Sequence, residues 1–267
     1  METTTVLDKQ TIETVKVTVP VLAEHGQAIT SRFYQLLFIN NPELKNIFNQ
    51  TNQKKGKQSQ ALANAIYAAA ANIDQLENIL PVVHQIAHKH RSLNIRPEHY
   101  PIIGENLLKA MQDVLKEAAT EEIIAAWAKA YNVIADIFIE VEKDMYQETD
   151  MKPGGWTGYR DFNVFQKVKE SDVITSFYLK PTDNGPIPAY DAGQYVTIKV
   201  NIPGVSYTCQ RQYSLSSKPN GEFFKISVKK EEGLINNPDG VVSTYLHDSV
   251  QEGNTIALSA PAGGILF

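Results

Sequence analysis

The stretch Met151-Lys152-Pro153-Gly154-Gly155 separates two halves of the sequence that have different hydrophobic patterns. Proline and glycine interrupt regular structure, so the stretch predicts a linker, which we place at residues 149–155. Apolar residues recur at helical spacing before the linker and alternate with polar residues after it. The sequence therefore predicts two domains, one over residues 1–148 and one over residues 156–267.

The first half contains seven segments with helical periodicity and no convincing strand. The longest, residues 121–147, places Ile124, Trp127 and Tyr131 on one apolar stripe. Pro42 stands at the expected first position of a short helix, where its missing N–H costs nothing. The other six predicted helices cover residues 7–23, 26–38, 42–48, 59–71, 80–92 and 97–118.

The second half shows period-two alternation in six segments that are separated by turn residues. The predicted strands cover residues 161–168, 173–179, 194–200, 207–214, 222–229 and 255–259, and one helix is predicted at 242–248. Six strands with one short helix indicate an antiparallel barrel.

The bulk composition is that of an ordinary globular protein, with 43% apolar and 21% charged residues. A net charge of −5 with interspersed signs gives no electrostatic footprint for nucleic acid or anionic membrane. The single cysteine, Cys209, excludes an intramolecular disulfide and a Cys-x-x-Cys-His motif for covalent haem. With neither a signal pattern nor an apolar run long enough to span a membrane, the sequence predicts a cytoplasmic protein.

The stretch Val83-His84-Gln85-Ile86-Ala87-His88-Lys89-His90 places the imidazole of His90 on an apolar helix face. An isolated histidine of this kind is most often a core residue bonded to a backbone carbonyl, and the alternative is a haem ligand in a dry pocket. His84 and His88, four residues apart, could form half of a metal site. No cysteine or carboxylate set nearby completes such a site, so we expect both side chains to be solvated.

The stretch Arg211-Gln212-Tyr213-Ser214 offers a cation, an aromatic ring and a hydroxyl on a predicted strand. Alternation puts Arg211 and Tyr213 on one face and Ser214 on the other. A flavin needs a stacking surface and a charge to offset its phosphates, and such a strand can supply both. Gly240-Val241-Val242-Ser243 precedes the predicted short helix, whose first N–H groups could bind an anion, although many loops enter a helix in this way.

Taken together, these motifs resemble the bacterial flavohaemoglobins over essentially the whole chain. The matching segments are Asn41-Pro42-Glu43-Leu44-Lys45, Lys89-His90, Gly154-Gly155-Trp156, Gly193-Gln194-Tyr195, Arg211-Gln212-Tyr213-Ser214 and Ala260-Pro261-Ala262-Gly263. The resemblance implies an all-α globin fold followed by an antiparallel six-stranded FAD-binding β-barrel of the ferredoxin-reductase type. The family continues with a nicotinamide-binding domain, whereas this chain stops at Phe267, so we expect that NAD-binding domain to be absent.

On the distal side of the haem, the resemblance assigns Tyr34 the role of donating a hydrogen bond to iron-bound oxygen. Gln58 and Leu62 match the distal helix positions beside the ligand, and Phe48 matches the phenylalanine that packs on the porphyrin. Without the resemblance, Tyr34 would be a half-buried aromatic with a surface hydroxyl, and Gln58 a surface amide.

On the proximal side, the resemblance makes His90 the ligand of the haem iron. Tyr100 and Glu142 match the residues that hydrogen-bond to its imidazole, and such an acceptor raises the basicity of the ligand. A solvated glutamate is the alternative for Glu142, because glutamate is seldom buried. Lys89 could shift the haem potential by its charge, and otherwise it is an exposed lysine.

In the barrel, the resemblance implies that Tyr213 stacks on the isoalloxazine, Ser214 approaches its N5 and Arg211 offsets phosphate charge. The implied flavin contacts are Tyr195, Arg211, Gln212, Tyr213, Ser214, Gly240, Val242 and Ser243. The last three belong to the helix start that would hold the pyrophosphate.

The function implied is that of a nitric oxide dioxygenase, which converts nitric oxide and dioxygen to nitrate with haem b and FAD. Electrons would pass from NAD(P)H through FAD to the haem. Two alternatives are an oxygen-binding or gas-sensing globin and a haem-flavin peroxide reductase. We expect a monomer that binds no nucleic acid, and the resemblance leaves room for a lipid in the distal haem pocket.

Overall fold

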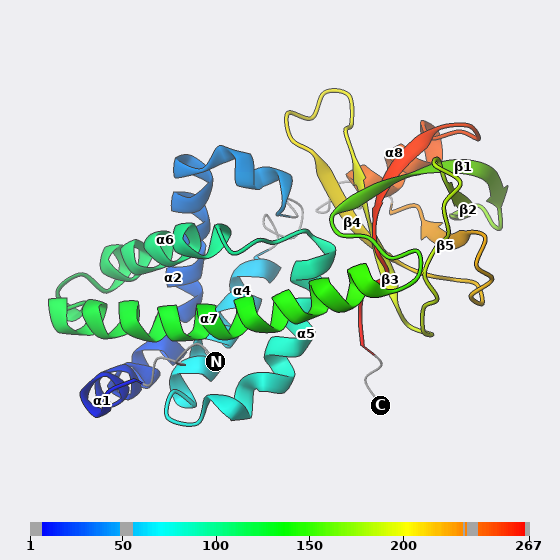
Figure 1. Ribbon diagram of the computed structural model, residues 1–267. Coiled ribbons are helices and arrows are strands. Elements are labelled where there is room, and N and C mark those ends of the chain that lie inside the picture. The colour runs from blue at the N-terminus through cyan, green and yellow to red at the C-terminus, as the bar shows by residue number, and fades with distance from the viewer. Residues whose placement is uncertain (1–6, 49–55, 232, 234–239, 265–267) are drawn as a thin grey trace. The chain divides into compact units, whose positions relative to one another are not determined.

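The computed structural model describes residues 7–48, 56–231, 233 and 240–264, and Phe267 lies outside them (Figure 1). The chain divides into two compact units. Unit 1 consists of residues 1–45, 50–84 and 96–141, and unit 2 of residues 46–49, 85–95 and 142–267.

Each of the seven predicted helical segments contains helix, and the chain before residue 152 has no strand among its described residues. The α-helices are α1 (Lys9–Val17), α2 (Val19–Asn40), α4 (Lys57–Ala71), α5 (Leu80–Ser92), α6 (His99–Leu115) and α7 (Glu121–Met151). Three short 3-10 helices accompany them: η1 (Pro42–Asn46), η2 (Leu76–Ile79) and η3 (Lys116–Ala118).

The first helix boundary differs from the prediction. The break lies at Thr18, where the hydroxyl and the N–H both donate to the Val15 carbonyl, and α2 then starts with Pro20 in its first turn. No break follows at residues 24–25, and α2 continues through Gly26. A Cβ atom on Gly26 would lie 3.4 Å from the Cβ of Ala63, so the glycine allows α2 and α4 to approach closely.

The segment predicted as a helix at 42–48 is the five-residue 3-10 helix η1, a tighter helix that occurs in short pieces. At the other end, α7 continues to Met151, beyond the expected end at residue 147 and into the predicted linker. Pro153 then prevents continuation of the helix, and Gly154 adopts a φ of +76° that turns the chain away.

The core of unit 1 is formed by large apolar side chains of its long helices. Ile29, Phe33 and Leu37 of α2 are at most 1% exposed, and Met111 of α6 and Trp127 of α7 are buried with them. The indole Nε1 of Trp127 donates to the Thr18 hydroxyl at 3.2 Å, so its polar atom is satisfied inside the core.

Unit 2 contains the predicted six strands in one antiparallel sheet with the order β4-β3-β6-β1-β2-β5. The strands are β1 (Tyr159–Lys169), β2 (Ile174–Pro181), β3 (Tyr195–Val200), β4 (Cys209–Ser214), β5 (Phe224–Lys229) and β6 (Thr255–Ser259). A bridge between Leu215 and Ile226 joins the two ends of this order, so the sheet is a nearly closed barrel. The predicted fold class is confirmed.

The barrel interior is filled by alternate strand residues, including Phe162, Phe177 and Phe224, all 0% exposed. Helix α8 (Val241–Asp248) packs Val242 and Leu246 into the same core. Among the helices of the described residues, none combines the length and the apolarity that crossing a membrane requires.

Candidate functional site

The first candidate site is built around His90, which lies in the last turn of α5. Its Nδ1 lies 2.7 Å from Oε1 of Glu142, a residue of α7 that is only 3% exposed. A carboxylate accepts hydrogen bonds, so Nδ1 carries the proton and donates a hydrogen bond to Glu142. Nε2 is then the ring nitrogen whose lone pair would bind a metal.

The partner of His90 bears on the alternative interpretations. A core histidine is ordinarily satisfied by a neutral backbone carbonyl, whereas Glu142 presents a buried carboxylate to the ring. The alternative of a solvated glutamate does not hold for Glu142, which is 3% exposed. A carboxylate on the outer nitrogen fixes the ring orientation and makes the opposite nitrogen more basic, which suits a metal ligand. The assignment of His90 to a haem iron stays a prediction.

The neighbouring candidates on α5 differ in exposure. His84 and Lys89 are exposed, as expected for solvated side chains, and His88 is half-buried, so its predicted solvation is only partial. Among the described residues, no group of three histidine, cysteine, aspartate or glutamate side chains could hold a metal ion. The described residues therefore do not supply the further ligands that a metal site at His84 and His88 would need.

Tyr34, the predicted distal residue, lies on α2 and is 5% exposed, so the alternative of a half-buried ring with a surface hydroxyl does not hold. Its ring packs edge-on against Phe33 at 4.8 Å between centroids and stacks with Phe38 at 5.9 Å. Burial raises the pKa of the Tyr34 hydroxyl, which therefore keeps its proton and can donate a hydrogen bond.

Gln58 and Leu62 lie one turn apart on α4, and both are half-buried. The hydroxyl of Thr30 on α2 donates to the carbonyl of Ser59 at 2.8 Å, and this bond joins α2 to α4 one turn from Tyr34 and next to Gln58. The Oε1 atom of Gln58 is buried and has no hydrogen-bond partner among the described residues. A buried amide oxygen without a donor points to a ligand or water that would complete the site.

Tyr100 and Phe48 complete the set of predicted haem residues. Tyr100, on α6, is buried, its carbonyl accepts a 2.6 Å hydrogen bond from the Tyr131 hydroxyl, and its ring lies 6.3 Å from that of Phe138. Phe48 follows η1 and is half-buried. Taken by itself, the His90 imidazole with its buried carboxylate has the donor set that a haem iron requires of an axial ligand.

The second candidate site lies on β3 and β4, which pair antiparallel. Tyr195 stands opposite Ser214, Val196 opposite Tyr213 and Ile198 opposite Arg211. The predicted alternation is therefore present, with Arg211 and Tyr213 on the face of the interior residue Ile198 and with Ser214 on the other face. Gln212 shares that other face and is exposed, as is Ser214.

The aromatic hydroxyls at this site remain protonated. Burial raises the pKa of Tyr213 to about 12, and the positive charge of Arg211 opposes part of that rise. Burial also raises the pKa of Tyr195. Neutral rings of this kind can stack on an apolar cofactor and still offer a hydrogen-bond donor.

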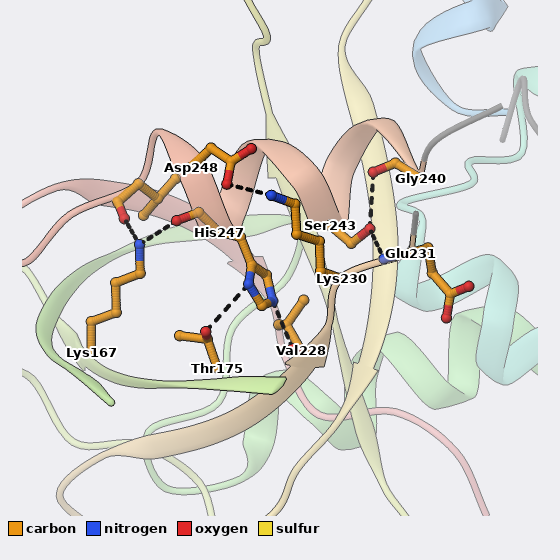
Figure 2. Close-up of polar contacts among 10 residues, drawn as sticks. Lys167, Thr175, Val228, Lys230, Glu231, Gly240, Ser243, His247 and Asp248 are labelled. Atoms are coloured by element: carbon orange, nitrogen blue, oxygen red, sulfur yellow. Dashed lines mark hydrogen bonds and ion pairs between the residues drawn. The ribbon is translucent and has the colours of Figure 1, made fainter. Parts of the chain in front are cut away.

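The start of α8 is the candidate site for a phosphate (Figure 2). The first-turn N–H groups of Val241, Val242 and Ser243 have no intrahelical acceptor and could bind an anion. The N–H group of Gly240 is not available to an anion as expected, because it donates to the Glu231 carbonyl at 2.8 Å. The Ser243 hydroxyl donates to the Gly240 carbonyl at 2.9 Å and accepts from the Glu231 N–H at 3.1 Å, which joins Glu231 to the first turn of α8.

Ser243 and Glu231 lie so close to the Cα of Gly240 that a side chain at this position would clash with them. A Cβ atom on Gly240 would lie 2.5 Å from Ser243 Oγ and 2.7 Å from the Cβ of Glu231. The N–H groups of the first helical turn, which have no acceptor within the helix, fit the diphosphate of a flavin nucleotide.

Two residues that the sequence did not single out hold the other end of α8, as Figure 2 shows. Lys167 of β1 donates to the carbonyls of His247 and Val250, both at 2.7 Å. The Nε2 of His247 lies 2.8 Å from the Val228 carbonyl, and its Nδ1 lies 3.3 Å from the Thr175 hydroxyl. A lysine near the last carbonyls of a helix is a known stabilising pattern, but the sequence gives no sign that a residue 80 positions away would provide it.

Arg91 is a further residue that sequence analysis missed. It is 7% exposed, and its guanidinium donates to the carbonyl of Pro261. The next residue, Ser92, accepts a 3.0 Å hydrogen bond from Gln212 of β4. Arginine is ordinarily exposed, so no pattern in the sequence indicated that this one is buried.

Comparison with known proteins gives two matching family models. Residues 31–138 match the globin model, and residues 161–267 match the model of the oxidoreductase FAD-binding domain. Both matches agree with the helical and barrel architecture described above.

The flavohemoprotein of Oceanobacillus iheyensis is 62% identical over 265 residues, which are 99% of this chain and 65% of that protein. Among solved structures, the flavohemoglobin from Malassezia yamatoensis with bound FAD and heme matches with a TM-score of 0.83 and 25% identity, over 97% of this chain and 65% of that one. A bacterial globin from Campylobacter jejuni matches with a TM-score of 0.51 and 41% identity, over 52% of this chain and 99% of its own. This chain thus spans slightly less than two thirds of the length of its curated relative.

Proposed function

We propose that this chain, which belongs to the flavohemoprotein family, binds haem b and FAD and acts as an oxidoreductase that converts nitric oxide and dioxygen to nitrate. The observation that carries the proposal is the 2.7 Å contact between His90 Nδ1 and the buried carboxylate of Glu142. An imidazole held in this way is suited to be a strong, fixed axial ligand, and a surface histidine would not need a buried carboxylate.

When bound through His90, a haem would supply the iron at which dioxygen is activated, and FAD would supply electrons one at a time. Glu142 accepts a hydrogen bond from His90 Nδ1 and would thereby leave the lone pair of Nε2 available to bind the iron. Tyr100 is assigned to the same proximal side by the family resemblance alone. Lys89 is an exposed cation next to His90, and its charge would raise the haem potential.

On the distal side, Tyr34 would donate a hydrogen bond from its buried, protonated hydroxyl. Gln58, whose Oε1 lacks a donor among the described residues, would accept one. Leu62 and Phe48 would supply apolar walls that exclude water from the reaction. These roles suit a site that binds two small uncharged gases, dioxygen and nitric oxide.

In the barrel, the rings of Tyr195 and Tyr213 would contact the isoalloxazine, with Ser214 and Gln212 on the polar side and Arg211 near phosphate. The N–H groups of Val242 and Ser243 would bind the diphosphate beyond Gly240. The family resemblance makes NAD(P)H the electron source for this flavin.

A visible spectrum and a product assay test the proposal. The purified chain should show separable haem and flavin bands, and after photoreduction of the flavin with a sacrificial donor it should convert nitric oxide and dioxygen to nitrate. A flavin-reduced protein that binds dioxygen but yields no nitrate would favour an oxygen-binding or gas-sensing globin. Consumption of peroxide without nitrate formation would favour a peroxide reductase, and absence of a Soret band would refute the proposal.

A further inference from the structure

Arg91 is a buried cation whose charge is not balanced within the part of the chain that the structure describes. Its side chain is 7% exposed, and no carboxylate of the described residues lies within 4.0 Å of it. Two other arginines differ in this respect, because Arg160 pairs with Asp183 and Arg32 pairs with Asp113. The guanidinium of Arg91 donates to one neutral acceptor, the carbonyl of Pro261.

Burying such a group has a high cost. Arginine stays protonated in proteins, so it cannot reduce the cost by losing its charge. A neutral carbonyl offsets only part of the desolvation, and buried charges in proteins are ordinarily paired. A guanidinium in this position therefore indicates that an anion from outside the polypeptide belongs beside it.

The surroundings of Arg91 identify where this anion would lie. Pro261 precedes Ala262, which exchanges two backbone hydrogen bonds of 2.8 and 2.9 Å with Tyr195. Tyr195 stands opposite Ser214 in the β3–β4 pair. The carbonyl that accepts from Arg91 is thus adjacent in the backbone to the strand pair that carries the candidate contacts of the flavin ring.

The residue after Arg91, Ser92, forms a hydrogen bond with β4 of the same strand pair. Gln212 donates to the hydroxyl of Ser92, and Gln212 is on the same face of β4 as Ser214. The Ser92 hydroxyl and the Arg91 charge also oppose the burial that raises the pKa of Tyr195, so the guanidinium charge is felt at that ring. The segment Arg91-Ser92 therefore faces the ring side of the candidate flavin site, and the diphosphate is assigned to α8.

We propose that Arg91 is the fixed positive charge that stabilises the negative charge of the reduced flavin and so raises its reduction potential. The inference rests on the proposed function, because it requires FAD at the β3–β4 site. Two-electron reduction of the isoalloxazine with uptake of one proton leaves one negative charge on the ring, and the oxidised ring is neutral. A cation beside the ring therefore favours the reduced form, which is a recognised way for a protein to tune this cofactor.

The experiment is a dye-coupled redox titration of flavin and haem in the full chain with both cofactors bound, for wild type and for variants at Arg91. Arg91→Gln and Arg91→Met both remove the charge, and Gln retains a donor for the Pro261 carbonyl. Both should weaken binding of the reduced flavin relative to the oxidised flavin at least tenfold, which lowers a two-electron potential by about 30 mV. Arg91→Lys keeps the charge and should shift the potential much less.

The controls separate charge from structure. Arg32→Gln removes a half-exposed arginine of unit 1 and should leave the flavin potential unchanged. A shift in Arg91→Met without one in Arg91→Gln would show that the hydrogen bond to Pro261 matters and the charge does not, and would overturn the proposal. The proposal would also fail if FAD stayed bound at full stoichiometry with an unchanged potential, or if only the haem potential moved. A wild-type chain that binds no flavin would instead refute the proposed function and, with it, this inference.

Discussion

The two candidate cofactor sites of this protein are assembled over different sequence distances. His90 and Glu142 lie 52 positions apart on α5 and α7, and a 2.7 Å contact between their side chains joins them. Tyr195 and Ser214 face each other across one pair of neighbouring strands, and several backbone bonds fix their register. The helical site therefore depends on a few side chains, whereas the barrel site is held by many small contacts. Substitutions should accordingly have all-or-none effects at the former and graded effects at the latter.

Replacement of His90 is the most severe test of this difference. We expect His90→Ala to abolish haem retention, because the substitution removes the imidazole that Glu142 holds in place. The Soret band of the purified protein measures this loss, and the flavin band should persist because the barrel core does not include His90.

His84→Ala is the matched control, since His84 is exposed on the same helix. His88→Ala should likewise leave haem stoichiometry unchanged. Haem bound at normal stoichiometry with an unaltered Soret band in His90→Ala would disprove the assignment of the ligand.

Tyr34→Phe should have the next largest effect. Loss of one hydrogen bond to a charge-bearing ligand costs about 1.5–3 kcal/mol, which corresponds to roughly 10- to 150-fold faster release of oxygen. Stopped-flow measurement of the oxygen off-rate gives the answer. Tyr67→Phe, on an exposed residue of α4, is the control, and an off-rate equal to that of wild type in Tyr34→Phe would place the hydroxyl elsewhere.

The same contrast explains which features the sequence could predict. All six strands and the face on which each residue of the β4 motif lies follow from period-two alternation, because a strand has only two faces. The helix break at Thr18 was missed, although a threonine shortly before a proline is a recognised signal of a helix start. The burial of Glu142 and Arg91 depends on packing against distant elements, and charged residues give no sign of it in their own sequence.

Gly240→Ala tests the barrel site by steric means. With φ −70° and ψ 93° the backbone of Gly240 is accessible to alanine, so the only conflict is with Ser243 Oγ and the Cβ of Glu231. Overpacking of this kind costs about 1–3 kcal/mol, and we expect the dissociation constant for FAD to rise roughly tenfold or more. Val241→Ala, at the exposed next position, should not change it. Unchanged FAD affinity in Gly240→Ala would mean that the diphosphate is not bound at α8.

Ser243→Ala should have the smallest of these effects and is measured as the FAD dissociation constant by fluorescence titration. The substitution removes a bond to the Gly240 carbonyl and one from the Glu231 N–H, yet the first-turn N–H groups of α8 remain in place. With a net value of about 0.5 kcal/mol for each of these two hydrogen bonds, about 1 kcal/mol in total, FAD affinity should fall about fivefold. Ser249→Ala is the matched control, because it makes the same serine-to-alanine change at the exposed opposite end of α8. It should leave the FAD dissociation constant unchanged. Because Lys167 and His247 still hold that opposite end, complete loss of FAD in Ser243→Ala would contradict the graded behaviour expected of the barrel and show that it, too, depends on single side chains.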